Sequence, residues 1–183
     1  MTVAEAIAAL KTRAVPGKAA EMAADHKAPR RYLGTGNPDI NDLAQGWRRS
    51  LTLDQRLVLA EGLWASNIHE ARVAAAKLLT QARIRPDGAV WGLIAGWVPG
   101  FDGWAIADHA CDAGERRLVA DPGRLDEVEG WTTSPVMWTR RAALVITLPS
   151  TRQNHPTPAD LVIRDRVPGW AASYAADPDW FIR

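Results

Sequence analysis

A tryptophan and an aspartate four residues apart, Trp104 and Asp108, are the residues of this chain best suited to chemistry at a charged centre. Asp102 precedes them as a candidate helix cap, and a spacing of four places both side chains on one face of the helix. The π face of an indole attracts a cation by about 0.5 to 2 kcal/mol, and a carboxylate about 4 Å away adds roughly 4 kcal/mol at an effective dielectric constant near 20. The pair predicts a site for a positively charged sugar or base. The alternative is a core tryptophan followed by a surface acid.

Arginine doublets are the second signal of function. Several arginines on one concave surface would bind phosphates and release condensed counterions. Two doublets have a tryptophan nearby, Trp47 before Arg48 and Arg49 and Trp138 before Arg140 and Arg141, which would place a stacking surface beside a phosphate clamp. The alternative for any one doublet is a solvated helix face. The doublets lie at residues 30–31, 48–49, 116–117 and 140–141.

Other chemistry finds little support in the sequence. The four histidines have no metal-ligand spacing, and the chain has no GxSxG, P-loop or GxGxxG dinucleotide motif in a suitable context. His109 is interpreted as a structural neighbour of Asp108, and Cys111 as a small buried hydrophobic residue. We therefore expect no metal and no cofactor.

The elements that must position these residues read as many short helices. Apolar residues between 68 and 82 recur at helical spacing, and sustained alternation of apolar and polar residues is absent. The apolar run 144–148 belongs to a segment that begins at Ser134 and ends at Pro149, and we interpret it as the buried end of a helix. Capping boxes and cap-proline pairs predict helix starts at Thr2 with Glu5, Thr52 with Gln55, Asn37-Pro38, Asp121-Pro122 and Thr157-Pro158.

A weak internal repeat indicates how the helices are arranged. Residues 66–75 align with residues 134–143 at a constant offset of 68, twice 34, with one serine, one arginine and two alanines identical. Tryptophans 64, 104, 138 and 170 follow one another at 40, 34 and 32 residues, close to the helix-pair unit of HEAT-type arrays. The sequence predicts an all-α, HEAT-like helical-repeat solenoid of about five helix pairs, with a concave groove.

The amino-acid composition limits which classes of protein and of site are possible. The 183 residues are 47% hydrophobic and 23% charged, with a formal net charge of +1, which is typical of a globular domain and excludes binding to nucleic acid through overall charge alone. A single cysteine excludes a disulfide framework and a cysteine zinc cage. We expect one domain over residues 1–183, with N-terminal helices over 1–31 and the repeat stack over 32–183.

The N-terminal residues lack a basic region before an apolar stretch, and no window approaches the roughly 18 apolar residues that a membrane helix needs. The chain is therefore expected to be cytoplasmic.

Five short motifs occur in order along the chain: Tyr32-Leu-Gly34 with Pro38, Leu63-Trp64 with His69-Glu70-Ala-Arg72, Trp104-x-x-x-Asp108, Trp131 with Trp138-x-x-Arg141, and Gly169-Trp170 with Tyr174 and Asp177-Pro178. On these motifs the chain resembles the AlkD-like family of HEAT-like-repeat alkylpurine DNA glycosylases from about residue 22 to its C-terminus. It departs from the family pattern in residues 22–27, which lack an aromatic residue, at Pro168, and at Ser173, where a basic residue is usual.

The resemblance implies roles for individual residues. Asp108 would be the catalytic carboxylate, Trp104 and Trp170 would be aromatic walls against the damaged nucleotide, and Arg141 would hold a backbone phosphate. Together with Arg140, Arg48 and Arg49 as further DNA-binding candidates, these residues would act on duplex DNA containing N3- or N7-alkylated purines. The family hydrolyses the bond between such a base and its deoxyribose.

We therefore expect a monomeric DNA glycosylase acting on alkylated purines. Two alternatives stay open: a relative that binds damaged or branched DNA without releasing bases, and a HEAT-like scaffold for protein interactions. A cleft in which Trp104, Asp108, Arg141 and Trp170 meet would favour the glycosylase.

Overall fold

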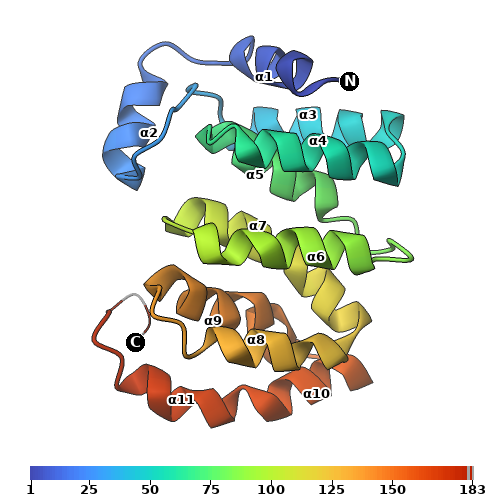
Figure 1. Ribbon diagram of the computed structural model, residues 1–183, viewed down its shortest axis with the longest axis vertical. Helices are drawn as coiled ribbons and strands as arrows, with labels where there is room; N and C mark the ends of the chain where they lie inside the picture. The colour runs from blue at the N-terminus through green and yellow to red at the C-terminus, as the bar shows by residue number, and fades with distance from the viewer. Residues whose placement is uncertain (181, 183) are drawn as a thin grey trace.

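The computed structural model describes residues 1–180 and 182, and the regular secondary structure of this part of the chain is helical apart from two isolated β-bridges. The predicted all-α fold is confirmed. Its α-helices (Figure 1) are α1 (Val3–Lys11), α2 (Lys18–His26), α3 (Asn37–Ser50), α4 (Leu53–Ala65), α5 (His69–Leu79), α6 (Gly88–Trp97), α7 (Trp104–Ala120), α8 (Leu125–Trp131), α9 (Met137–Thr151), α10 (Pro158–Arg166) and α11 (Pro168–Ala175), with short 3-10 helices at Val98–Gly100 and Pro122–Arg124.

Local capping explains three helix starts. The side chains of Thr2, Thr52 and Thr157 each accept a hydrogen bond from the backbone three residues on, and the residue at that position reaches back to the cap. These reciprocal bonds satisfy amide groups that have no partner inside the helix. The three corresponding predictions are confirmed, as is the helical state of residues 144–148, which lie in α9.

Two other predicted caps are wrong, each because a distant side chain pairs with the residue, and a third is confirmed for a shorter helix. Asn37 is the first residue of α3 after the cap Gly36, and its amide instead lies 3.4 Å from His109 Nε2. Asp102 is not the cap of α7, which is Gly103, and its carboxylate pairs with Arg30. Asp121 does cap a helix, but the 3-10 turn that starts at Pro122 rather than an α-helix.

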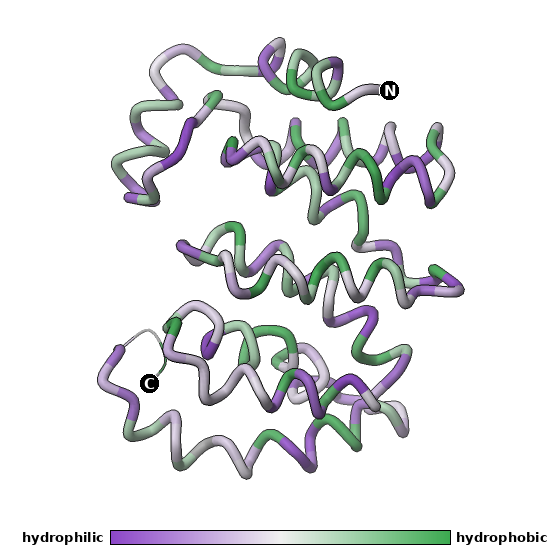
Figure 2. Tube along the Cα trace, viewed as in Figure 1, coloured by the Kyte–Doolittle hydropathy of each residue, from purple (hydrophilic) through white to green (hydrophobic). Residues whose placement is uncertain are grey.

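The helices stack in layers along the long axis of the molecule (Figure 1). Consecutive helices pack in pairs, α4 with α5, α6 with α7 and α8 with α9. The second helices of these pairs form a row in which α5 contacts α7 and α7 contacts α9. Polar and apolar residues are mixed along most helices (Figure 2), as is typical of helices that bury one side against their neighbours. This arrangement is consistent with a helical-repeat solenoid.

Small residues allow the helices of the row to approach closely. A Cβ atom added at Gly114 of α7 would lie 2.6 Å from Ile146 Cδ1 of α9, so a larger residue fits at this crossing only if the buried Ile146 side chain shifts. The aligned alanine pairs of the internal repeat, Ala74-Ala75 in α5 and Ala142-Ala143 in α9, are all buried. The offset of 68 residues thus relates α5 to α9, with α7 between them. The spaced tryptophans do not mark a repeat, since Trp64 lies in α4, the first helix of its pair.

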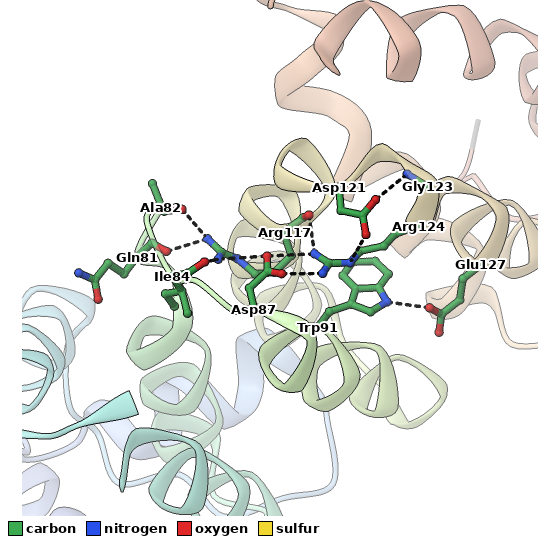
Figure 3. Close-up of polar contacts among 10 residues, drawn as sticks. All are labelled: Gln81, Ala82, Ile84, Asp87, Trp91, Arg117, Asp121, Gly123, Arg124 and Glu127. Atoms are coloured by element: carbon green, nitrogen blue, oxygen red, sulfur yellow. Dashed lines mark hydrogen bonds and ion pairs between the residues drawn. The ribbon is translucent and has the colours of Figure 1, made fainter. Parts of the chain in front are cut away.

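A buried arginine fixes the connection between α5 and α6 against α7. Arg117 of α7 is fully buried and donates to the carbonyls of Gln81 and Ala82 at 2.7 and 3.0 Å (Figure 3). Asp87 accepts from both Arg117 and Arg124, which joins this connection to the start of α8. Backbone carbonyls and a carboxylate thus accept from both terminal nitrogens, whereas Nε has no hydrogen-bond partner among the described residues; without these acceptors the buried charge would be strongly destabilising.

None of the helices in the described residues is long and apolar enough to cross a membrane.

Candidate functional site

Asp108 and Trp104 lie one turn apart near the start of α7, in the middle of the helix row. The side chain of Asp108 is 39% exposed and Trp104 is 42% exposed, so both are open to solvent. Trp104 is therefore not the core residue that the alternative interpretation required. An indole and a carboxylate open to the same solvent are suited to a cationic ligand.

Arg141 of α9 holds the carboxylate of Asp108 with both terminal nitrogens. This two-point contact fixes the orientation of the carboxylate and not only its position. The guanidinium also lies 6.0 Å from the centre of the Trp138 ring and is 20% exposed. The structure thus brings together three of the predicted residues, Trp104, Asp108 and Arg141, although Arg141 contacts the carboxylate here.

Arg140, the other member of the doublet, is a structural residue. Its guanidinium pairs with Asp177 at 2.8 and 3.1 Å and with Asp179 at 3.0 Å, and it donates to the carbonyl of Ser134. These carboxylates raise the pKa of Arg140 above its ordinary value, Asp177 contributing most. Arg140 is therefore poorly placed to bind DNA as expected, because its N–H groups already donate to the segment after α11 and hold that segment against α9.

Trp170 does not form an exposed wall of the site. It is 5% exposed and its Nε1 donates to Glu129 of α8 at 3.1 Å. The expectation for Trp170 failed because α11 packs this indole inward against α8. The aromatic surface of the site must come from other residues.

Arg48 and Arg49 lie at the C-terminal end of α3. Arg48 donates to the carbonyl of Lys77 at 3.0 Å and to the Thr80 hydroxyl at 2.7 Å, at the end of α5. Burial and the neighbouring Arg49 lower the pKa of Arg48. Arg49 is exposed, and both arginines border a hollow of about 380 Å³ with Gln45 and Gln81. Arg49 is thus the freer of the two cations for an external phosphate.

Rings from distant parts of the chain surround Trp104, and sequence reasoning missed them. His26 of α2 lies 5.2 Å from Trp104 between ring centres and stacks on His69 of α5 at 4.4 Å. Tyr32 stacks on His69 at 5.0 Å and on His26 at 6.0 Å, so the three rings contact one another. No spacing could reveal this cluster, because its members lie in four separate segments.

Charged and polar groups continue along α7 beyond Asp108. Asp112 stands one turn after Asp108, and burial together with the Asp108 charge raises its pKa. His109 lies between Asp112 at 3.9 Å and Asn37 at 3.4 Å, and burial lowers its pKa to about 4. Lys77 of α5 acts electrostatically on both Asp112 and His109. A neutral imidazole and a second carboxylate therefore flank the candidate catalytic residue.

The interpretation of Cys111 is confirmed. It is 2% exposed, its Sγ lies 3.8 Å from the carbonyl of Ala142, and burial raises the pKa of the thiol. Within the described residues, no three His, Cys, Asp or Glu side chains are placed to hold a metal ion.

Residues 6–183 match a family described as DNA alkylation repair enzyme. No curated protein and no solved structure matches the chain.

Proposed function

The chain belongs to the DNA alkylation repair enzyme family, and from this membership we propose that it is a DNA glycosylase that hydrolyses the bond between deoxyribose and an N3- or N7-alkylated purine in duplex DNA. The observation that carries the proposal is the solvent-open carboxylate of Asp108, held by Arg141 one turn from the exposed Trp104. A role in DNA alkylation repair follows from the family. The reaction is our inference from the site.

A single carboxylate is enough for this reaction. Alkylation at N3 or N7 gives the purine a positive charge, so the base can leave without the general acid that ordinary glycosidases need. As the bond breaks, positive charge moves from the base to the deoxyribose. Asp108 would stabilise the sugar cation and orient the attacking water. The histidine and second carboxylate nearby are not required for this step.

Trp104 and Arg141 have complementary parts in the proposal. The exposed indole of Trp104 offers a π face to the cationic nucleotide before the bond breaks. Arg141 has five N–H donors, of which two face Asp108, so the guanidinium can hold the carboxylate and still donate to an adjacent phosphate. Arg141 would then place the backbone of the damaged nucleotide next to the carboxylate.

Replacing Asp108 tests the proposal directly. Only stabilisation gained in the transition state accelerates the step, and about 3 kcal/mol of it corresponds to roughly a hundredfold in rate. We expect Asp108→Asn to lower release of 7-methylguanine and 3-methyladenine from methylated duplex DNA about a hundredfold, with duplex binding preserved. Asp112→Asn, one turn further along α7, is the matched control and should keep most of the activity.

Two results would reject the glycosylase. A wild-type chain that binds duplex DNA but releases no alkylated base would be a non-catalytic DNA-binding relative. A chain that also fails to bind duplex at low salt would be a scaffold for protein interactions.

A further inference from the structure

Four exposed arginines lie where helices of the row end. Arg49 is in the last turn of α3, Arg83 and Arg85 follow α5, and Arg116 lies near the C-terminal end of α7. The ends of these helices lie on one side of the stack (Figure 1). None of the four guanidinium groups forms an ion pair or a hydrogen bond with residues 1–180 or 182. We call these four residues the arginine edge.

Two neighbouring hollows show that the arginine edge is one surface. The first hollow, of about 380 Å³, has Arg49 and Gln81 among its lining residues. The second hollow, of about 400 Å³, has Ala82, Arg85 and Arg116 in its walls. Because Gln81 borders one hollow and the next residue borders the other, the surface continues from the end of α3 to the end of α7.

The buried Arg117 fixes this surface in place. It donates to the backbone carbonyls of Gln81 and Ala82 (Figure 3), so the segment that follows α5 is held against α7. Its neighbour Arg116 is exposed, so one arginine of this doublet positions the edge and the other belongs to it. Cations on a surface that is already ordered lose less conformational entropy when they bind a ligand.

The exposed charge of this surface is mainly positive. Two acidic residues, Glu115 and Asp160, also line the second hollow. Asp160 is 5% exposed and accepts hydrogen bonds from the backbone and the hydroxyl of Thr157. Glu115 is half-buried, and burial raises its pKa. Four exposed guanidinium groups beside two withdrawn carboxylates suit a polyanion.

The arginine edge lies beside the line of contacts at the candidate site. Asp108 in α7 and Arg141 in α9 are both in the first half of their helices, whereas the arginine edge crosses the helix ends. Arg116 follows Asp108 by eight residues, or about 12 Å along the axis, and steps of four keep both on one side of α7. The two backbones of B-DNA border grooves about 6 and 12 Å wide. Two lines of contact at this spacing fit the two strands of a duplex.

We propose that the arginine edge binds phosphates of the complementary strand while the damaged strand lies along Asp108 and Arg141. The inference rests on the proposed function, which places the damaged deoxyribose at Asp108. Guanidinium groups bind phosphate oxygens without reading bases, so the edge orients the duplex and does not select its sequence. Each contact releases condensed counterions, so a chain with a net charge of only +1 can still hold DNA.

A double variant, Arg85→Gln with Arg116→Gln, tests the phosphate contacts. Loss of two contacts should make the slope of log K against log salt shallower by about two units and weaken duplex binding at least tenfold. The control is Arg13→Gln with Arg166→Gln, which removes the same charge from two arginines that are already in ion pairs. The control should keep the wild-type slope. Melting temperatures equal to that of wild type ensure that a misfolded chain is not counted.

Neutral methylphosphonate linkages identify the strand that the edge contacts. The duplex carries one tetrahydrofuran abasic-site analogue, which has no base to release, so binding is measured without turnover. Methylphosphonates in the complementary strand should weaken binding of wild type and leave that of the Arg85→Gln, Arg116→Gln double variant unchanged. Methylphosphonates in the strand with the analogue should weaken binding of both proteins alike.

The outcomes separate this inference from the proposed function. If methylphosphonates lose their effect on the double variant in the analogue strand and not in the complementary strand, the edge contacts the damaged strand and the inference is wrong. A double variant with the wild-type slope also rejects it, and the glycosylase stands if wild type releases bases. A wild type that shows the expected strand pattern but releases no base keeps the edge as a duplex-binding surface and rejects the glycosylase. A wild type that binds no duplex at low salt rejects both.

Discussion

Arg140 and Arg141 follow one another in α9, but their side chains meet different partners. Arg140 contacts Asp177 and Asp179 after α11, whereas Arg141 contacts Asp108 in α7. The sequence presents them as one basic doublet, because the partners lie more than 30 residues away in opposite directions. The fold alone decides which arginine is structural and which belongs to the site.

Conservative replacement of each arginine should separate these roles. Lysine keeps the charge but cannot make the two-point contact of a guanidinium with a carboxylate. Arg141→Lys should lower kcat/KM for base release about tenfold and leave the melting temperature within about 2 °C of wild type, because the site is open to solvent. Arg140→Lys should lower the melting temperature and affect the rate less. Equal loss of activity in both variants at equal stability would contradict this assignment.

The neutral histidines beside Trp104 make stability depend on pH. Their folded-state pKa values, about 3 for His69 and about 4 for His109, lie below the ordinary 6.5, so the unfolded chain binds more protons in between. The free energy of unfolding should be insensitive to these histidines above about pH 7.5. As the pH falls below about 6.5, each should contribute a loss of up to roughly 1.4 kcal/mol per pH unit.

Denaturant unfolding at pH 7.5, 6.0 and 5.0 measures this loss. His69→Phe keeps a ring against His26 and Tyr32 but cannot be protonated, so its stability should fall less steeply with pH than that of wild type. His155→Gln changes an exposed histidine and should keep the wild-type slope. A His69→Phe slope equal to that of wild type would show that His69 is not held neutral by the fold.

Helix starts show what the sequence could predict about the fold. Thr2, Thr52 and Thr157 cap helices through bonds to residues three positions on, so their signal is local and the predictions are confirmed. Asn37 and Asp102 are predicted as caps from the same local pattern. In the structure the side chain of Asn37 contacts His109, and that of Asp102 pairs with Arg30. Both partners lie 72 residues away in sequence. A cap can be predicted only where no tertiary partner competes for it.

In the candidate site, too, some residues could be predicted from local spacing and others could not. Trp104 and Asp108 could be predicted, since both lie on α7 and their spacing alone puts them on one face. His26 and His69 come from α2 and α5, and only packing brings them to Trp104. Trp170 matched the family pattern, yet it is buried against Glu129, because a sequence position does not fix which way a packed helix turns.

The α7–α9 crossing should be sensitive to a single methyl group. In Gly114→Ala the new Cβ would lie 2.6 Å from Ile146 Cδ1, and overpacking of this kind costs about 1 to 3 kcal/mol. Gly92→Ala in α6 meets nothing within 4 Å and should stabilise by about 0.5 to 1 kcal/mol. Denaturant unfolding of both variants checks the prediction. Base release should also fall in Gly114→Ala, because α9 carries Arg141 and α7 carries Asp108. Equal stability of the Gly114→Ala and Gly92→Ala variants would contradict the close crossing of α7 and α9.

The charge of the entire chain constrains how it could hold DNA. With a formal net charge of +1, overall attraction to the duplex is small, so binding depends on a few local cations along the helix row. Many of the arginines are already paired, including Arg30, Arg117, Arg124, Arg140 and Arg166. Arg49 is exposed at the end of α3, and it forms no ion pair within the part of the chain that the structure describes.

The salt dependence of duplex binding measures how many phosphate contacts the chain makes. The slope of log K against log salt is about −0.9 for each phosphate contact in B-DNA, so a chain that uses few cations should show a shallow slope. Arg49→Ala should make the slope shallower by about one unit, because one contact and its released counterion are lost. Arg166→Gln removes an arginine that Asp126 and Glu129 already neutralise, and should leave the slope unchanged. Two outcomes would contradict this prediction: a slope that Arg49→Ala does not change, or a slope that both variants reduce equally. Either outcome would place the DNA away from the end of α3, so the hollow beside Arg48 would have no part in duplex binding.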